Sequence, residues 1–176
     1  MARLPIPRSE DLSPGDRALL EALTAKRGRI GGMYQTLLNH PPLLEKVSAL
    51  GAYLRFEPSA LPPDVRELAV LACARSLGAA YEWVKHVPPA REANVPEAVI
   101  EALRQGQEPP GLDAVRRAVL EAASCALARR SIPAPVQAVI VEALGVAGVV
   151  ELVVLCGFYA MIAGVIFAFD VPLPPG

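Results

Sequence analysis

The sequence has few aromatic residues, few charges and almost no strand-forming pattern. Aromatic residues make up 5% of its 176 residues and charged residues 20%, and the formal net charge is −1. With no basic block and no acidic tail, the electrostatics give no reason to expect nucleic acid or an anionic membrane as a partner. Hydrophobic residues make up 53%. This excess predicts apolar surface that is buried between subunits as well as within one.

Cysteine is also sparse. Cys73, Cys125 and Cys156 lie far apart in apolar surroundings, with no Cys-x-x-Cys pair and no metal-ligand spacing. Such thiols usually act as small buried hydrophobic side chains. A reducing cytoplasm suits them, so we expect a cytoplasmic protein.

The chain shows no signal-peptide pattern. Residues 1–14 are polar and interrupted by proline, without the apolar stretch of a leader, and we expect an extended arm there before one domain over residues 15–176. Residues 152–169 form an 18-residue run without charge, which reaches the lower limit for a membrane span. Glu151 and Asp170 flank this run where basic residues would be expected. We therefore favour a helix at a subunit interface over a membrane helix.

Helix start and stop signals recur along the whole chain. Proline pairs open several segments, Pro88-Pro89 should kink or locally break another, and Asn94 suits the left-handed position that ends it. The pattern predicts an all-α chain of about eight helices with short connections. Helices are expected over residues 14–28, 33–39, 41–55, 63–77, 79–93, 96–104, 113–130, 133–145 and 146–169.

A possible active site arises from one of only two histidines. His86 follows Glu82 by four residues, so the two share one helix face. Glu67 lies on the preceding helix, which is otherwise almost entirely apolar, and a carboxylate buried there would need a partner. Counting from Gly78, Glu67 is about 16 Å back and His86 about 12 Å forward along the two helix axes. An antiparallel hairpin would therefore bring both carboxylates to the imidazole.

Two carboxylates around an imidazole can relay protons near neutral pH, which suits general acid–base catalysis. Other interpretations stay open at this point. A Glu/His pair at this spacing can be a plain surface contact, and Glu67 could pair with Arg66, Arg75 or Lys85. Glu67, Glu82 and His86 could also supply three ligands to a metal ion, although we expect neither a metal nor another cofactor.

Three neighbours on the same helix are further candidates. Tyr81, Trp83 and Lys85 could contact a substrate, although packing is the ordinary role of the two aromatic residues. His40, before Pro41-Pro42, is expected to be a loop residue at a helix boundary.

At these residues the chain resembles the carboxymuconolactone decarboxylase-like superfamily, which includes alkyl hydroperoxidase D. The peroxidase branch carries a Glu, eleven residues, a Cys, two residues, a Cys, three residues and a His. The same spacing here runs through Glu67, Ala79, Glu82 and His86, with Ala79 and Glu82 in the cysteine positions. The similarity covers roughly residues 15–175 and is densest over residues 62–100.

The resemblance implies an all-helical fold built on a helical hairpin and assembled as trimers or hexamers, or possibly dimers. The resemblance to the decarboxylase branch implies an enzyme that acts on a small organic acid or lactone without a cofactor. Glu82 and His86 would be the acid–base pair that protonates a dienolate after loss of CO₂, and Glu67 would orient His86. Lys85, Arg75 or Arg91 could bind an anionic substrate.

Two alternatives remain. The first is peroxiredoxin-type antioxidant activity of the alkyl hydroperoxidase kind. That chemistry uses the cysteine pair, which Ala79 and Glu82 replace, and the only nearby thiol, Cys73, lies off the helix face of Glu67. The second is a non-catalytic helical oligomer.

Overall fold

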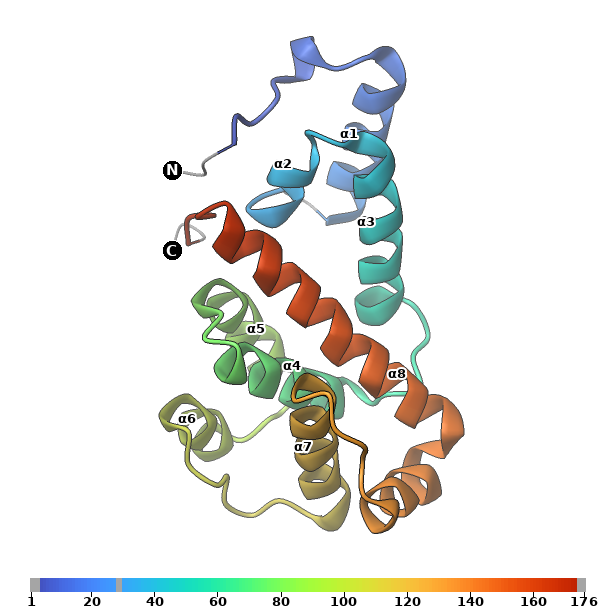
Figure 1. Cartoon of the computed structure of the whole chain (residues 1–176), viewed down its shortest axis with the longest axis vertical. Coiled ribbons are helices and arrows are strands. Elements are labelled where there is room, and N and C mark those ends of the chain that lie inside the picture. Colours follow the sequence, from blue (N-terminus) through green and yellow to red (C-terminus); the bar gives the residue numbers. More distant parts are fainter. Residues whose placement is uncertain (1–3, 28–29, 174–176) are drawn as a thin grey trace. The chain divides into compact units, whose positions relative to one another are not determined.

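The chain is all-helical, as predicted. The computed structural model describes residues 4–27 and 30–173, and in these residues it contains eight α-helices and no strand (Figure 1). In chain order the elements are the 3₁₀ helix η1 (Ser9–Asp11) and the helices α1 (Pro14–Arg27), α2 (Met33–Leu37), α3 (Pro41–Phe56), α4 (Pro63–Ser76), α5 (Ala80–Glu92), α6 (Glu97–Gln105), α7 (Ala114–Leu127) and α8 (Ala134–Ala168).

The chain forms two compact units. One comprises residues 1–57 and 164–176, and the other residues 58–163. All of the candidate site residues belong to the second unit. The single domain expected over residues 15–176 stays a prediction.

In the first unit, α3 packs with α1 and α2. The buried core between them contains Leu23, Leu38 and Leu44. His40 precedes α3, and its Nδ1 accepts a hydrogen bond from the backbone N–H of Leu43 at 3.3 Å. His40 is thus the N-cap of α3, at the helix boundary where the sequence placed it.

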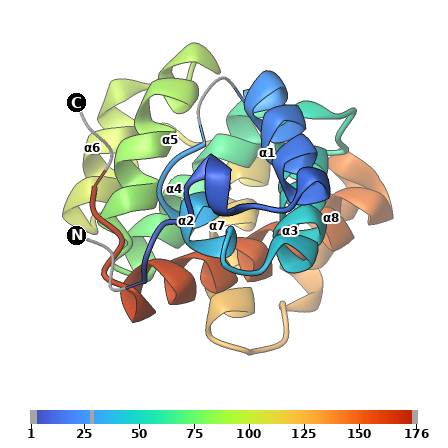
Figure 2. The ribbon, with the colours of Figure 1, turned by 90° about the horizontal axis from the view of Figure 1, so that it is seen from above.

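The second unit is built around α4, which packs against α5, α6 and α7 (Figure 2). Eight residues of α4 are buried, as expected for a helix that is apolar on every face. Gly78 adopts φ +64° between α4 and α5, a conformation that glycine reaches without strain. The tight turn lets α5 fold back along α4. The core of this unit contains Leu68, Leu71, Ala90, Val95, Val99, Ile100, Leu103 and Leu112.

The prolines inside α5 do not end the helix, whereas Asn94 ends it in the conformation that the sequence predicted. Pro88 and Pro89 lie inside the helix, where neither can donate a backbone hydrogen bond, yet α5 continues to Glu92. Asn94 has φ +63°, the left-handed conformation expected just beyond the helix end.

The long helix α8 contains the break expected at Gly145, which has φ 71° and ψ 173°. Beyond the break, the buried carboxylate of Glu151 accepts hydrogen bonds from the Ser59 hydroxyl and, at 2.9 Å, from the backbone N–H of Ala60. These bonds attach the segment before α4 to α8. They also satisfy a carboxylate that would be costly to bury alone.

By length and composition alone, α8 could cross a membrane. In its most apolar 18-residue window, 39% of the residues are buried inside the structure. Core helices of soluble proteins meet the same criterion.

Candidate active site

The hairpin of α4 and α5 brings Glu67 and His86 into direct contact. Oε2 of Glu67 lies 2.7 Å from Nδ1 of His86, and each residue is only 2% exposed. This contact is the one that helix rise predicted for an antiparallel hairpin. A separation of 2.7 Å is typical of a hydrogen bond strengthened by charge.

The other ring nitrogen of His86 faces two further groups. The Tyr159 hydroxyl, from α8, lies 3.0 Å from Nε2, and the two rings meet edge to face at an interplanar angle of 87°. Oε2 of Glu82, one turn earlier on α5, lies 3.5 Å from the same nitrogen. Both residues are buried, Tyr159 at 3% and Glu82 at 7% exposure. We refer to Glu67, Glu82, His86 and Tyr159 as the His86 cluster.

The His86 cluster can hold the ring in two charge states without moving it. With Glu67 ionised, Nδ1–H donates to Glu67 in both states. In the neutral ring, Nε2 accepts the Tyr159 hydroxyl proton, whereas in the charged ring Nε2–H can donate to Glu82 or to the Tyr159 oxygen. Nε2 is therefore the position at which a proton can be taken up or released.

Glu67 has a second polar neighbour in Arg66. Nε of Arg66 lies 3.4 Å from Oε1 of Glu67. Of the three basic residues that the sequence offered as partners of Glu67, Arg66 is therefore one that contacts it. Arg75 instead donates to the carbonyl of Arg104 at 3.0 Å.

The weaker candidates differ in how far they are buried. Tyr81 is buried, Trp83 packs against the core of the second unit, and Lys85 is exposed. Trp83 also lines a cavity of about 430 Å³ between α5 and α6. Beside this cavity, Arg91 forms a two-point ion pair with Glu97 at 2.7 and 2.8 Å.

Tyr159 is the site residue that sequence reasoning missed. It lies inside the uncharged run of residues 152–169, to which we assigned no site residue. A buried tyrosine hydroxyl nearly always needs a hydrogen-bond partner. The tyrosine hydroxyl in this otherwise apolar run therefore indicated that a hydrogen-bond partner lies nearby. The neighbouring sequence did not identify His86 as that partner.

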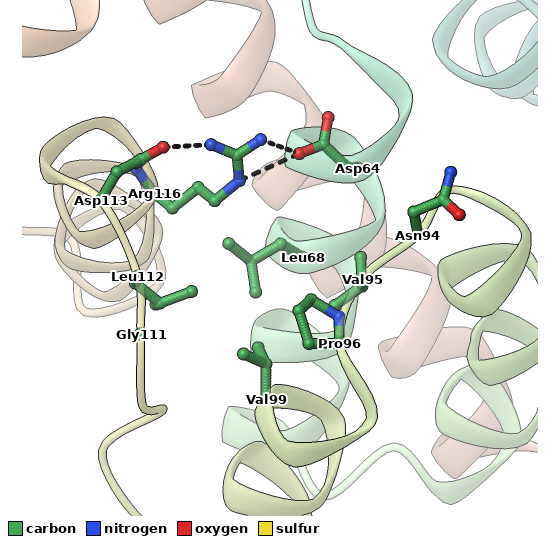
Figure 3. A pocket seen from close by; sticks show the side chains of 10 residues that line it. All are labelled: Asp64, Leu68, Asn94, Val95, Pro96, Val99, Gly111, Leu112, Asp113 and Arg116. Carbon is green, nitrogen blue, oxygen red and sulfur yellow. Dashed lines mark hydrogen bonds and ion pairs between the residues drawn. The ribbon is translucent and has the colours of Figure 1, made fainter.

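A second polar feature lies at the mouth of a cavity of about 250 Å³ between α4, α7 and the start of α6 (Figure 3). The Arg116 guanidinium bonds to Asp64, with Nε at 2.9 Å, and also to Asp113. The hydrogen bond to Asp64 raises the pKa of Arg116, and the backbone N–H of Arg116 lowers the pKa of Asp113. Two carboxylates already neutralise this guanidinium, so it is poorly suited to binding an anionic substrate.

The cavities described within residues 58–163 lie away from the imidazole. None of the three is lined by Glu67, Glu82 or His86. Among the described residues, no buried side-chain nitrogen or oxygen lacks a hydrogen-bond partner. The His86 cluster is therefore an internally satisfied polar group inside an apolar unit.

The described residues also show no metal-binding arrangement. No group of three His, Cys, Asp or Glu side chains among them has suitable geometry. Both nitrogens of His86 already have close protein partners.

The fold defines the class of protein. It is similar to the alkylhydroperoxidase AhpD core of a peroxidase-related protein from Ralstonia eutropha JMP134, with a TM-score of 0.83, 16% identity, and coverage of 98% of this chain and 92% of the other. A peroxidase-related protein from Silicibacter sp. TM1040 gives a TM-score of 0.79 at 19% identity, with coverage of 97% and 91%. At these identities the comparisons establish an AhpD-like helical fold.

The sequence matches a family model over part of its length. Residues 41–124 match the model of the carboxymuconolactone decarboxylase family, and this segment includes Glu67, Glu82 and His86. The resemblance predicted from residue spacing is thereby confirmed. A comparison with curated proteins gave no match.

Removing the Tyr159 hydroxyl should test whether it completes the His86 cluster. Tyr159→Phe leaves a buried ring nitrogen with only Glu82 nearby, and we expect the free energy of unfolding to fall by about 1–2 kcal/mol. Urea denaturation followed by circular dichroism would measure the loss. Tyr53→Phe, at an exposed position on α3, is the control and should change stability little. Equal stability of the two variants would contradict the hydrogen bond to His86.

Proposed function

We propose that the protein is a cofactor-independent acid–base enzyme, a lyase or isomerase that acts on a small organic acid or lactone. The observation that carries this proposal is the 2.7 Å contact between Glu67 and Nδ1 of His86, which leaves Nε2 as the proton-exchanging atom. The match of residues 41–124 to the carboxymuconolactone decarboxylase family model supports it. So does the absence of thiols at Ala79 and Glu82, where the peroxidase branch has cysteines.

Each member of the His86 cluster has a role in this proposal. Glu67 holds the ring and compensates the charge of the imidazolium, as carboxylate partners of catalytic histidines do. Glu82 has the most exposed side chain of the two carboxylates, at 9% against 3% for Glu67, and is the second acid–base group. The Tyr159 hydroxyl could donate to an oxygen that becomes negatively charged.

Decarboxylation illustrates the proton balance. Cleavage of the bond to CO₂ leaves its electron pair on a dienolate, and Nε2–H or protonated Glu82 then delivers a proton to carbon. Solvent restores that proton, so the net reaction consumes one proton and releases CO₂. Because the cluster is buried, Glu82 or Tyr159 must move to admit substrate.

The non-catalytic oligomer is supported by one observation. The polar groups of the His86 cluster satisfy one another, and the three described cavities lie elsewhere. A purely structural network would have the same geometry. The two functions therefore have to be separated by an activity measurement.

Replacing His86 provides that measurement. We expect His86→Gln to lower kcat by about 10²-fold or more on carboxymuconolactone or related lactone acids, with a smaller change in KM, because general acid–base groups contribute about 10²–10⁴-fold. CO₂ release and incorporation of solvent deuterium into the product would be followed. His40→Gln, at the other histidine, should retain full turnover. Unchanged turnover in His86→Gln would contradict the site, and a wild-type protein inert towards the whole substrate panel would favour the non-catalytic oligomer.

We also propose that the protein is a cytoplasmic homo-oligomer. Within the second unit, the exposed face of α8 carries Val146, Val150, Val154, Gly157 and Met161, with no charged residue among them. Successive members lie four, four, three and four residues apart, which keeps them on one face of the helix, as in a helix-packing seam. A second copy of the same face could cover this surface, which a soluble monomer would leave in water.

A charge placed in the seam should separate the subunits. We expect Val150→Glu to convert the wild-type oligomer to monomers, measured as molar mass by size-exclusion chromatography with light scattering. Val84→Glu, at an exposed valine on α5, is the matched control and should keep the wild-type mass. A monomeric wild-type protein would contradict the proposal, and a wild-type protein that needs detergent would favour the membrane interpretation of α8.

A further inference from the structure

The largest of the three described cavities lies between α4, α7 and the connection from α6 to α7. Its volume is about 620 Å³, which is in the range of small-molecule sites. One face of α4 and one face of α7 line it, since residues 72, 75 and 76 and residues 117, 120, 121 and 124 recur at helical spacing. Its apolar surface includes Leu103, Leu112 and Leu120. No member of the His86 cluster lines this cavity, so it is a separate feature from the proposed acid–base site.

Two guanidinium groups at this cavity are bonded only to backbone carbonyls. Nε of Arg75 donates to the carbonyl of Arg104 at 3.0 Å, and Nη1 of Arg117 donates to the carbonyl of Leu112. Neither guanidinium forms an ion pair within the described part of the chain, whereas Arg91 and Arg104 each pair with a glutamate. Arg75 and Arg117 therefore bring two uncompensated positive charges, with unused N–H donors, to one cavity.

A glycine at the end of α6 makes room for the first of these groups. Gly106 is the C-cap of α6 with φ +71°, and a Cβ at this position would lie 3.0 Å from Nη2 of Arg75. A side chain there would push the guanidinium aside. The hydrogen bond to Arg104 and the open space at Gly106 thus hold Arg75 at the end of α6. Donors that are already in position bind a carboxylate at a lower entropic cost.

The same cavity has two carboxylates that lack a partner among the described residues, Glu108 and Glu121. Glu121 follows Arg117 by four residues, a spacing that favours an ion pair on a helix, but Arg117 bonds to a backbone carbonyl instead. The hydroxyls of Ser76 and Ser124 also have no hydrogen-bond partner within the described ranges. Charges of both signs and two neutral polar groups therefore surround an apolar surface.

We propose that this cavity binds a short apolar peptide with free termini. The C-terminal carboxylate of the peptide accepts hydrogen bonds from Arg75 and Arg117, and its ammonium group lies against Glu108 or Glu121. The serine hydroxyls bond to the peptide group, and the apolar side chains cover the three leucines. A dianion would meet the two glutamates and a diamine would meet the two arginines, so the cavity selects a ligand that carries both charges.

Calorimetric titration of the full-length wild-type protein with leucyl-leucine tests the proposal. We expect saturable binding that weakens about tenfold for N-acetyl-leucyl-leucine, which lacks the ammonium group, and for leucyl-leucine amide, which lacks the carboxylate. Each analogue loses hydrogen bonds to a charged group. Arg75→Gln and Arg117→Gln should each weaken the binding of leucyl-leucine about five- to tenfold. Arg130→Gln, at an exposed arginine outside the cavity, is the matched control and should bind like the wild type.

Several outcomes would overturn the proposal. They are no saturable binding of leucyl-leucine at millimolar concentration, equal binding of both blocked analogues, or an equal loss of affinity in Arg130→Gln. Leucine that binds as tightly as leucyl-leucine would overturn the assignment to a peptide. The ligand series on the wild-type protein decides the matter alone if an arginine variant fails to fold. Peptide binding and lactone turnover are separate measurements, so either proposal can fail without the other.

Discussion

The second unit depends on one buried contact, the hydrogen bond between Glu67 and His86. A carboxylate in the middle of an apolar helix is strongly destabilising unless it is paired and hydrogen-bonded. Since Glu67 is only 2% exposed, its carboxylate cannot reach water, and the imidazole on α5 supplies its main partner. The turn at Gly78 and the register of the hairpin are what allow this contact. Through Tyr159, the same ring also fixes where α8 meets the hairpin.

At the two positions where the peroxidase branch of the similar superfamily has cysteines, this chain has Ala79 and Glu82. Glu82 lies where the second cysteine would be, and it faces Nε2 of the same histidine. A carboxylate there can exchange protons but cannot form a disulfide.

The sequence predicted the parts of the site that depend on local geometry. Helix rise and one glycine turn were enough to bring Glu67 to His86, and the i,i+4 spacing placed Glu82 beside them. The helix break at Gly145 and the left-handed conformation of Asn94 could also be predicted, because each depends on the backbone preference of a single residue. The contact of Tyr159 with His86 was not predicted, since it depends on where α8 packs. No local pattern specifies a contact between residues so distant in the chain.

The orientation of the His86 proton is the most direct test of this account, and ¹⁵N NMR of the two histidine rings can read it. The structure predicts opposite neutral tautomers. Nδ1 of His86 should carry a proton because it donates to Glu67, while Nδ1 of His40 should be unprotonated because it accepts from the Leu43 backbone N–H. A proton on Nδ1 of His86, with Nε2 either free or also protonated, would support the central claim. A ring protonated at Nε2 alone would contradict it, because Glu67 would then not be the carboxylate that holds the imidazole.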